Sequence, residues 1–183
     1  MRCSLLTIGF ISFLMLESCF KDGEGICPTE KFSFERIDYT GNEIRTEGFY
    51  YGNSFNTLSS DDTIYEIFFL FKNGVILNAG GAEYENMTSY IEVLRSSGSI
   101  YESKKDWGLF KIENGIVTFN QLIPRQCGIW MRERTGVVLN DSTMLLTEEI
   151  IHMKNETTIE TINDTFCFYP YSAKPDSTNQ FLD

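Results

Sequence analysis

Length, composition and charge favour one compact domain and weigh against several classes of function. The chain has 183 residues, of which 42% are hydrophobic and 22% charged, so it can bury a core and does not have a disordered composition. Its formal net charge of -11 would repel phosphate backbones, so we expect no nucleic-acid partner.

The N-terminal residues have the pattern of a secretory signal peptide. Arg2 supplies a positive start, and Leu5–Leu16 is an apolar run. That run is shorter than the about 20 residues that a membrane span needs, but it fits the core of a signal peptide. The sequence LESC at residues 16–19 then resembles the lipobox of bacterial lipoproteins. The resemblance implies that a diacylglycerol, with acyl chains such as palmitate, is attached to the sulfur of Cys19 and that the chain is cleaved before it.

The lipobox implies an address in the cell envelope. Residues 1–18 are then a lipoprotein signal peptide, 19–31 a tether and 32–183 the folded domain, held at the outer membrane by the N-terminal lipid. Lys21 and Asp22 resemble the surface-export signal of some Gram-negative lipoproteins, but a solvated tether explains them equally well. Periplasmic and surface faces therefore both stay open. The alternative is an ordinary signal peptide followed by an incidental cysteine.

The rest of the chain is typical of short strands joined by tight turns. Residues 44–52 are rich in aromatic and β-branched side chains. Asn73-Gly74 and Asn114-Gly115 each separate two apolar runs, which predicts hairpins with positive φ at both turn residues. Asn140-Asp141 and Asn163-Asp164 predict two further turns.

One segment has a helical pattern instead. Apolar residues recur there at steps of three and four, at Tyr84, Met87, Ile91 and Leu94, which predicts a helix over 83–96 with Gly98 as its C-terminal cap. The strand predicted at 63–72 is apolar on both faces. Such a strand needs the interior of a barrel on one side and a cover, such as this helix, on the other.

These elements predict a mainly β fold: a single antiparallel barrel of about eight to nine strands with one helix near 83–96. Their order resembles that of lipocalin-like barrels among bacterial lipoproteins. Gly48-Phe49-Tyr50 stands where such barrels carry a G-x-W sequence, with tyrosine in place of tryptophan. The resemblance implies a barrel that holds a small ligand.

Large aromatic residues are the candidates for lining such a cavity. We expect five of them to reach the interior: Tyr50, Phe69, Trp107, Phe119 and Trp130. Stacking of these rings on a hydrophobic ligand or a glycan is the functional interpretation. Their use as plain core is the alternative, since a barrel of about eight strands can be filled by its own side chains.

Catalytic and metal-binding patterns are missing from the sequence. His152 is the only histidine, and the chain has neither CxxC nor HxxxH spacing. We therefore expect a non-enzymatic protein with no metal or cofactor, although hydrolysis by paired acids needs no sequence signature. Disulfide pairing among Cys27, Cys127 and Cys167 stays open. Two functions follow: a lipid-anchored binder of a small ligand, or a filled barrel that serves as an interaction module in an envelope complex.

Overall fold

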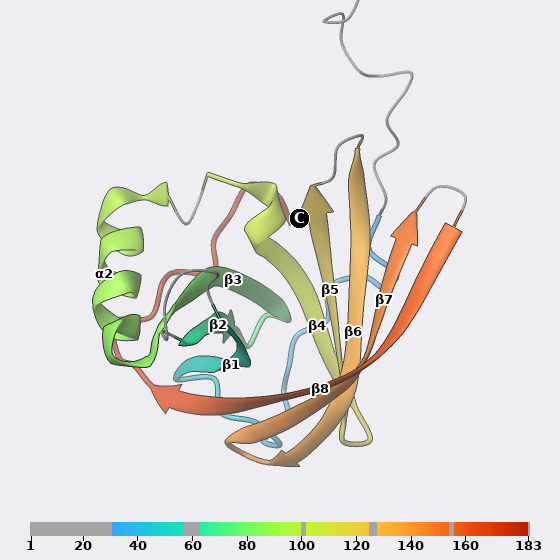
Figure 1. The fold of residues 1–183 in the computed structure, drawn as a ribbon, viewed down its shortest axis with the longest axis horizontal. Helices are drawn as coiled ribbons and strands as arrows, with labels where there is room; N and C mark the ends of the chain where they lie inside the picture. Colours follow the sequence, from blue (N-terminus) through green and yellow to red (C-terminus); the bar gives the residue numbers. More distant parts are fainter. Residues whose placement is uncertain (1–30, 57–62, 100–101, 125–127, 154–155, 183) are drawn as a thin grey trace, which may run out of the picture.

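The computed structural model describes residues 31–56, 63–99, 102–124, 128–153 and 156–182. They form a closed antiparallel barrel in which each strand pairs with the next and β8 pairs with β1 (Figure 1). The strands are β1 (Gly48–Asn56), β2 (Thr63–Leu70), β3 (Val75–Glu83), β4 (Trp107–Glu113), β5 (Ile116–Pro124), β6 (Ile129–Asn140), β7 (Thr143–Met153) and β8 (Glu156–Pro170). The predicted single antiparallel β-barrel is confirmed, with eight strands. The predicted signal peptide and Cys19 lie outside the described residues.

The two Asn-Gly turns differ from each other. Asn114 and Gly115 both have positive φ, 54° and 76°, as a two-residue hairpin turn requires. At the other hairpin only Gly74 has positive φ, and its amide donates to the carbonyl of Phe71. Both predicted hairpins are present, but the expectation of positive φ at both turn residues was wrong for Asn73. The chain from Tyr39 packs against this second turn, where the Tyr39 amide donates to the carbonyl of Lys72.

The turn predicted at Asn163-Asp164 was also wrong, because β8 runs unbroken from Glu156 to Pro170. Leu146 of β7 pairs with Asp164, but Glu148 pairs with Thr161, so β8 has one residue more than β7 in this stretch. The turn-forming residues are thus absorbed in a β-bulge, which leaves the ladder continuous on both sides. This explains why the barrel has eight strands and not nine.

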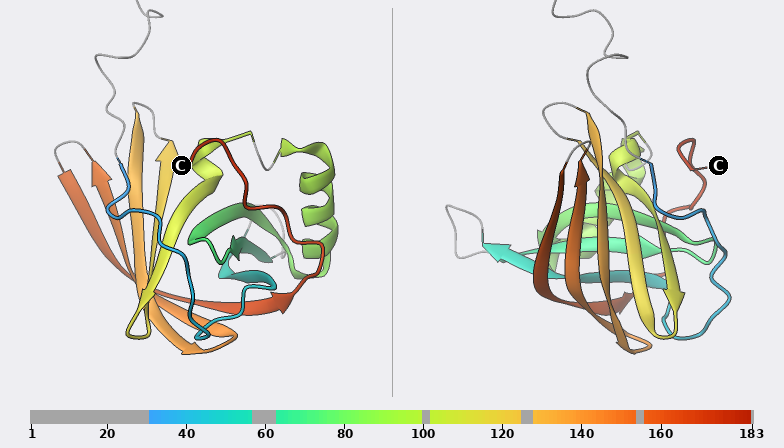
Figure 2. Two further views of the ribbon diagram at one scale, coloured as in Figure 1. Left: turned by 180° about the vertical axis from the view of Figure 1, so that it is seen from behind. Right: turned by 90° about the vertical axis from the view of Figure 1, so that its right-hand side faces the viewer.

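The predicted helix is present. A short 3-10 turn, η2 (Tyr84–Asn86), leads into α2 (Met87–Ser97). Gly98 ends the helix with φ 74°, and its amide donates to the carbonyl of Arg95. The ribbon places α2 outside β1–β3, on the side away from β4–β7 (Figures 1 and 2). Met87 and Ile91 are its buried residues.

The barrel wall separates two hydrophobic clusters. The inner cluster fills the barrel and consists of Ile44, Tyr50, Phe68, Leu70, Ile76, Phe110, Val117, Phe119, Met144, Leu146 and Phe166. The outer cluster lies beneath α2 and the terminal segments and consists of Phe49, Ile67, Phe69, Phe71, Val75, Leu77, Ala79, Ala82, Met87, Ile91, Trp107, Leu109 and Leu182. Because β2 contributes to both clusters, the prediction that its two faces are dry is confirmed.

Candidate functional site

Aromatic rings cross the interior of the barrel. Phe68 on β2 lies 4.7 Å from the ring of Phe166 on β8 and 5.2 Å from the ring of Phe119 on β5. All three side chains are 0% exposed. Tyr50 stacks on Phe68 and donates its hydroxyl hydrogen to the carbonyl of Arg45 or Asp141. Side chains therefore fill this part of the barrel.

Next to these rings lies a buried ionic network. Arg134 on β6 is 1% exposed and forms a two-pronged pair with Glu66 on β2, at 2.8 and 3.0 Å. It also donates to Oε1 of Gln121, which receives a second hydrogen bond from Arg132 at 2.8 Å. Asn78 donates to Glu66 at 2.8 Å. The network thus ties β2, β3, β5 and β6 together across the interior.

The charges of this network depend on one another. Burial by itself would lower the pKa of Arg134, but the charge and hydrogen bonds of Glu66 outweigh that effect and raise it. Burial raises the pKa of Asp164, against the opposing effect of Arg134. Among the described atoms, Nε of Arg134 and Nε2 of Gln121 are buried without a hydrogen-bond acceptor. The arrangement cross-links the barrel and places no nucleophile beside a base.

The five aromatic residues predicted to line a cavity do not come together. Tyr50 and Phe119 belong to the inner cluster, whereas Phe69 and Trp107 belong to the outer one, so the expectation that these two reach the interior was wrong. On β2 the inward residues are Phe68 and Leu70, which turns the neighbouring Phe69 outward. Trp130 is half-buried on β6.

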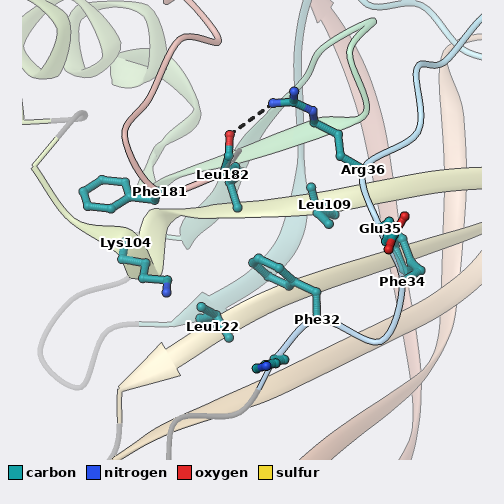
Figure 3. Close-up of a pocket in the computed structure, with 10 residues that line it drawn as sticks. Phe32, Phe34, Glu35, Arg36, Lys104, Leu109, Leu122, Phe181 and Leu182 are labelled. Carbon is teal, nitrogen blue, oxygen red and sulfur yellow. Dashed lines mark hydrogen bonds between the residues drawn. The ribbon is translucent and has the colours of Figure 1, made fainter.

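The larger of two described cavities lies outside the barrel. It is an open groove of about 940 Å³, which we call the terminal groove, and none of the five predicted aromatic residues lines it. Its walls are the N-terminal segment and the C-terminal tail, and its floor comes from β4 and β5 (Figure 3). The lining residues are Lys31, Phe32, Phe34, Glu35, Arg36, Lys104, Leu109, Leu122, Phe181 and Leu182.

The terminal groove combines apolar walls with positive charge. Phe32, Phe34, Phe181 and the buried Leu109 and Leu122 supply apolar surface. Three cations and one carboxylate line it as well: Lys31, Arg36, Lys104 and Glu35. Arg36 donates to the carbonyl of Leu182 at 3.1 Å, which joins the two walls (Figure 3). The volume of the terminal groove lies in the range of about 300–1,000 Å³ that is usual for small-molecule sites.

The N-terminal wall is anchored by polar contacts. The backbone amide and hydroxyl of Ser33 both donate to Oδ1 of Asn120 at 2.7 Å, and the hydroxyl also lies 2.7 Å from a carboxylate oxygen of Glu133. Asn120 is itself 0% exposed. Ser33 thereby fixes the chain between the two phenylalanines, Phe32 and Phe34, that face the groove.

A half-buried lysine, Lys174, holds the start of the C-terminal tail. Nζ of Lys174 donates to the carbonyls of Thr46 and Leu70 at 2.5 and 2.6 Å, and it lies 4.1 Å from the centre of the Phe71 ring. Burial lowers the pKa of Lys174 to about 8, with Glu47 opposing the shift and Lys72 adding to it. This contact directs residues 175–182 back over the outer cluster.

The second cavity, of about 310 Å³, lies between residues 37–43 and β4. Tyr39 and Phe110, whose ring centres are 5.8 Å apart, line it together with Glu43. The hydroxyl of Tyr39 accepts from the amide of Ile44 and donates to Glu43 at 2.9 Å. The segment that precedes β1 therefore forms part of the lining of both cavities.

Other reactive side chains do not gather. His152 is half-buried on β7, and Cys167 on β8 is a free, half-buried thiol. Cys27 and Cys127 lie outside the described residues. Within the described ranges, no three acidic, cysteine or histidine residues lie close enough to hold a metal ion. No helix in that part of the chain combines the length and apolarity that crossing a bilayer demands.

The fold and the groove define an eight-stranded up-and-down barrel with a ligand-sized groove between its two terminal segments. Comparison with protein-family models, with curated proteins and with solved structures finds no match to this chain. The groove was missed in the sequence because the predicted ligand site lies in the interior of the barrel and the predicted tether extends to residue 31. The alternation of Phe32 and Phe34, and the apolar pair Phe181-Leu182, are the signals that could have marked it.

Proposed function

We propose that this protein is a lipid-anchored envelope protein, without enzymatic activity, that binds a small hydrophobic ligand in the terminal groove. The observation that carries the proposal is a cavity of about 940 Å³ whose lining includes three phenylalanines and three leucines. A cavity of this size and lining is what a small apolar ligand requires. The aromatic packing of the inner cluster argues for placing the ligand outside the barrel.

The position of the groove supports a role near a membrane. Lys31, which lines the groove, is the first described residue, and the predicted lipid attachment at Cys19 is a short stretch of chain away. An attached diacylglycerol would hold the groove within reach of the bilayer surface. For this part of the proposal, Cys19→Ala should abolish incorporation of radiolabelled palmitate in cells, and persistent labelling would refute the anchor.

Ligand binding is tested on a chain that begins at residue 19 and carries Cys19→Ser. All described strands and the helix are kept in this chain, and β1 closes on β8 within it. The neutral fluorophore 1-N-phenylnaphthylamine should become brighter when it is titrated with the protein. The variant Phe32→Ser/Phe181→Ser should lose most of this signal, because both rings line the groove. The matched control is Ile159→Ser, which removes a 64% exposed apolar side chain from β8.

The interaction module remains the second candidate, and the filled inner cluster favours it. In that role the barrel would present its surface to an envelope protein and need no small ligand. If the fluorophore does not bind to a chain whose circular dichroism spectrum is that of a folded β protein, the groove is not a ligand site and this second function is left. Equal binding by the Phe32→Ser/Phe181→Ser variant and the unchanged chain would have the same consequence.

A further inference from the structure

The terminal groove is positively charged within an acidic protein. The chain carries a formal net charge of -11, yet among the described residues the charged ones that line the groove are Lys31, Arg36, Lys104 and Glu35. We infer that the ligand is an anionic amphiphile: an acyl chain that ends in a carboxylate or a phosphate. This inference rests on the proposed function, to which it adds the chemical class of the ligand.

The two kinds of side chain occupy different parts of the groove. Leu109 and Leu122, 4% and 2% exposed, form a floor on β4 and β5 that offers no polar side chain to a ligand. Phe32 belongs to the N-terminal wall of the groove and Phe181 to its C-terminal wall (Figure 3). An extended acyl chain would itself leave water on this floor and would cover the half-buried rings of Phe32 and Phe181. Removal of apolar surface from water is the dominant favourable term in binding an apolar group.

The three cations have different tasks. Arg36 is engaged by the carbonyl of Leu182, so its guanidinium joins the two walls of the groove. Lys104 lies on the other side of the groove, near Phe32 and Leu122 (Figure 3). Lys31 directly precedes Phe32, and both lysines are exposed. An anionic head group at this end would meet two ammonium groups, while its acyl chain runs over the leucine floor.

The charge of the surroundings makes this preference selective. A protein with a net charge of -11 repels anions in general, so an anionic ligand gains only where cations are concentrated. Exposed ion pairs are weak and are screened by salt. We therefore expect a preference for the anionic form of about 5- to 20-fold at low ionic strength, which should shrink to below about 3-fold at 1 M salt.

The test compares two ligands that differ only in their head group. Dodecanoate and 1-dodecanol are titrated at pH 8 against bound 1-N-phenylnaphthylamine, with the chain that begins at residue 19 and carries Cys19→Ser. Dodecanoate should displace the fluorophore at about 5- to 20-fold lower concentration than the alcohol. In Lys31→Gln/Lys104→Gln this difference should fall to about 2-fold or less, with displacement by the alcohol unchanged.

A second double variant controls for overall charge. Lys72→Gln/Lys105→Gln removes the same two charges from exposed positions that do not line the groove, and Lys105 is the direct neighbour of Lys104. This variant should keep the preference for dodecanoate. If it loses as much as Lys31→Gln/Lys104→Gln, the preference comes from net charge and the inference is overturned.

The remaining outcomes separate this inference from the proposed function. Equal displacement by dodecanoate and dodecanol would overturn the anionic class while the groove stays a ligand site. Failure of the fluorophore and of both ligands to bind would overturn the proposed function itself. Cosedimentation with phosphatidylglycerol vesicles tests whether the anionic head group belongs to a membrane lipid. Binding to these vesicles that requires Lys31 and Lys104, without binding of dodecanoate, would assign the same chemistry to a membrane lipid.

Discussion

The inner and outer clusters lie on the two faces of one sheet, but different interactions hold them. The inner cluster lies next to a charged network in which Arg134 on β6 pairs with Glu66 on β2, a strand that is not its neighbour, and also donates to Gln121 on the adjacent β5. The outer cluster consists of hydrophobic side chains, and its cover consists of α2 and the two terminal segments. The inner face is therefore closed on itself, whereas the outer face depends on added segments.

This difference bears on where a ligand can enter. Charged groups that are buried together must all stay paired, because an isolated charge in the interior is very costly. An apolar face that is covered by terminal segments needs no such pairing. The apolar surface of a ligand can therefore replace the apolar surface of a terminal segment there. The large groove is accordingly found at the edge of the outer cluster, where Phe32, Phe34, Phe181 and Leu182 meet it.

The largest effect is expected from breaking the inner network. Arg134→Met should lower the free energy of unfolding by about 3–5 kcal/mol, because Glu66 loses its two-pronged partner and keeps only the longer contact with Arg132, at 3.8 Å, as an ion pair. Equilibrium denaturation in urea measures this value. The double variant Glu66→Leu/Arg134→Met removes both charges and should be more stable than Arg134→Met. The losses in the free energy of unfolding of the single variants Glu66→Leu and Arg134→Met are then compared with the loss of the double variant. If the two single losses add up to the double loss, Glu66 and Arg134 are not coupled and this contrast between the two faces fails.

The sequence was a good guide to elements whose pattern is local. The helix could be predicted because Met87 and Ile91 recur at helical spacing and Gly98 follows, and all three have the expected role in the structure. The hairpin at Asn114-Gly115 could be predicted because this dipeptide favours positive φ at both turn positions, which both residues have here. The barrel followed from the succession of such hairpins.

Features that depend on distant partners could not be predicted. Asn163-Asp164 has the propensity for a turn, but pairing with β7 holds it in a strand. Phe69 and Phe68 are equivalent in the sequence, and only the closure of the barrel decides which one faces inward. Arg134 was not recognised because its partner Glu66 is 68 residues away. The groove was missed since it forms only when the two ends of the domain meet.

A smaller effect is expected on the outer face. Ile91 is 0% exposed on α2 and packs in the outer cluster, so Ile91→Ala should lower the free energy of unfolding by about 3 kcal/mol. Val93→Ala is the matched control on the same helix, since Val93 is 64% exposed and should lose less than about 0.5 kcal/mol. Urea denaturation measures both. Equal losses would mean that α2 does not pack on the barrel as described.

The smallest effect concerns the lysine that holds the C-terminal tail. Lys174 has a pKa of about 8 in the folded protein, below its ordinary value of 10.5, because burial disfavours its charge. Between these two values the unfolded chain binds more protons than the folded one, so the contribution of Lys174 to stability rises with pH. From pH 7 to pH 9.5 this gain should amount to about 2 kcal/mol.

Lys174→Met serves as the reference, since it keeps an apolar stem but cannot titrate. The difference in the free energy of unfolding between the unchanged chain and this variant should move by about 2 kcal/mol in favour of the lysine as the pH rises from 7 to 9.5. This range stays below pH 10, the ordinary pKa of tyrosine, whose folded value is raised to about 12 for Tyr171. A difference that does not change with pH would mean that Nζ of Lys174 stays in water, and that the outer face is not closed by the C-terminal tail.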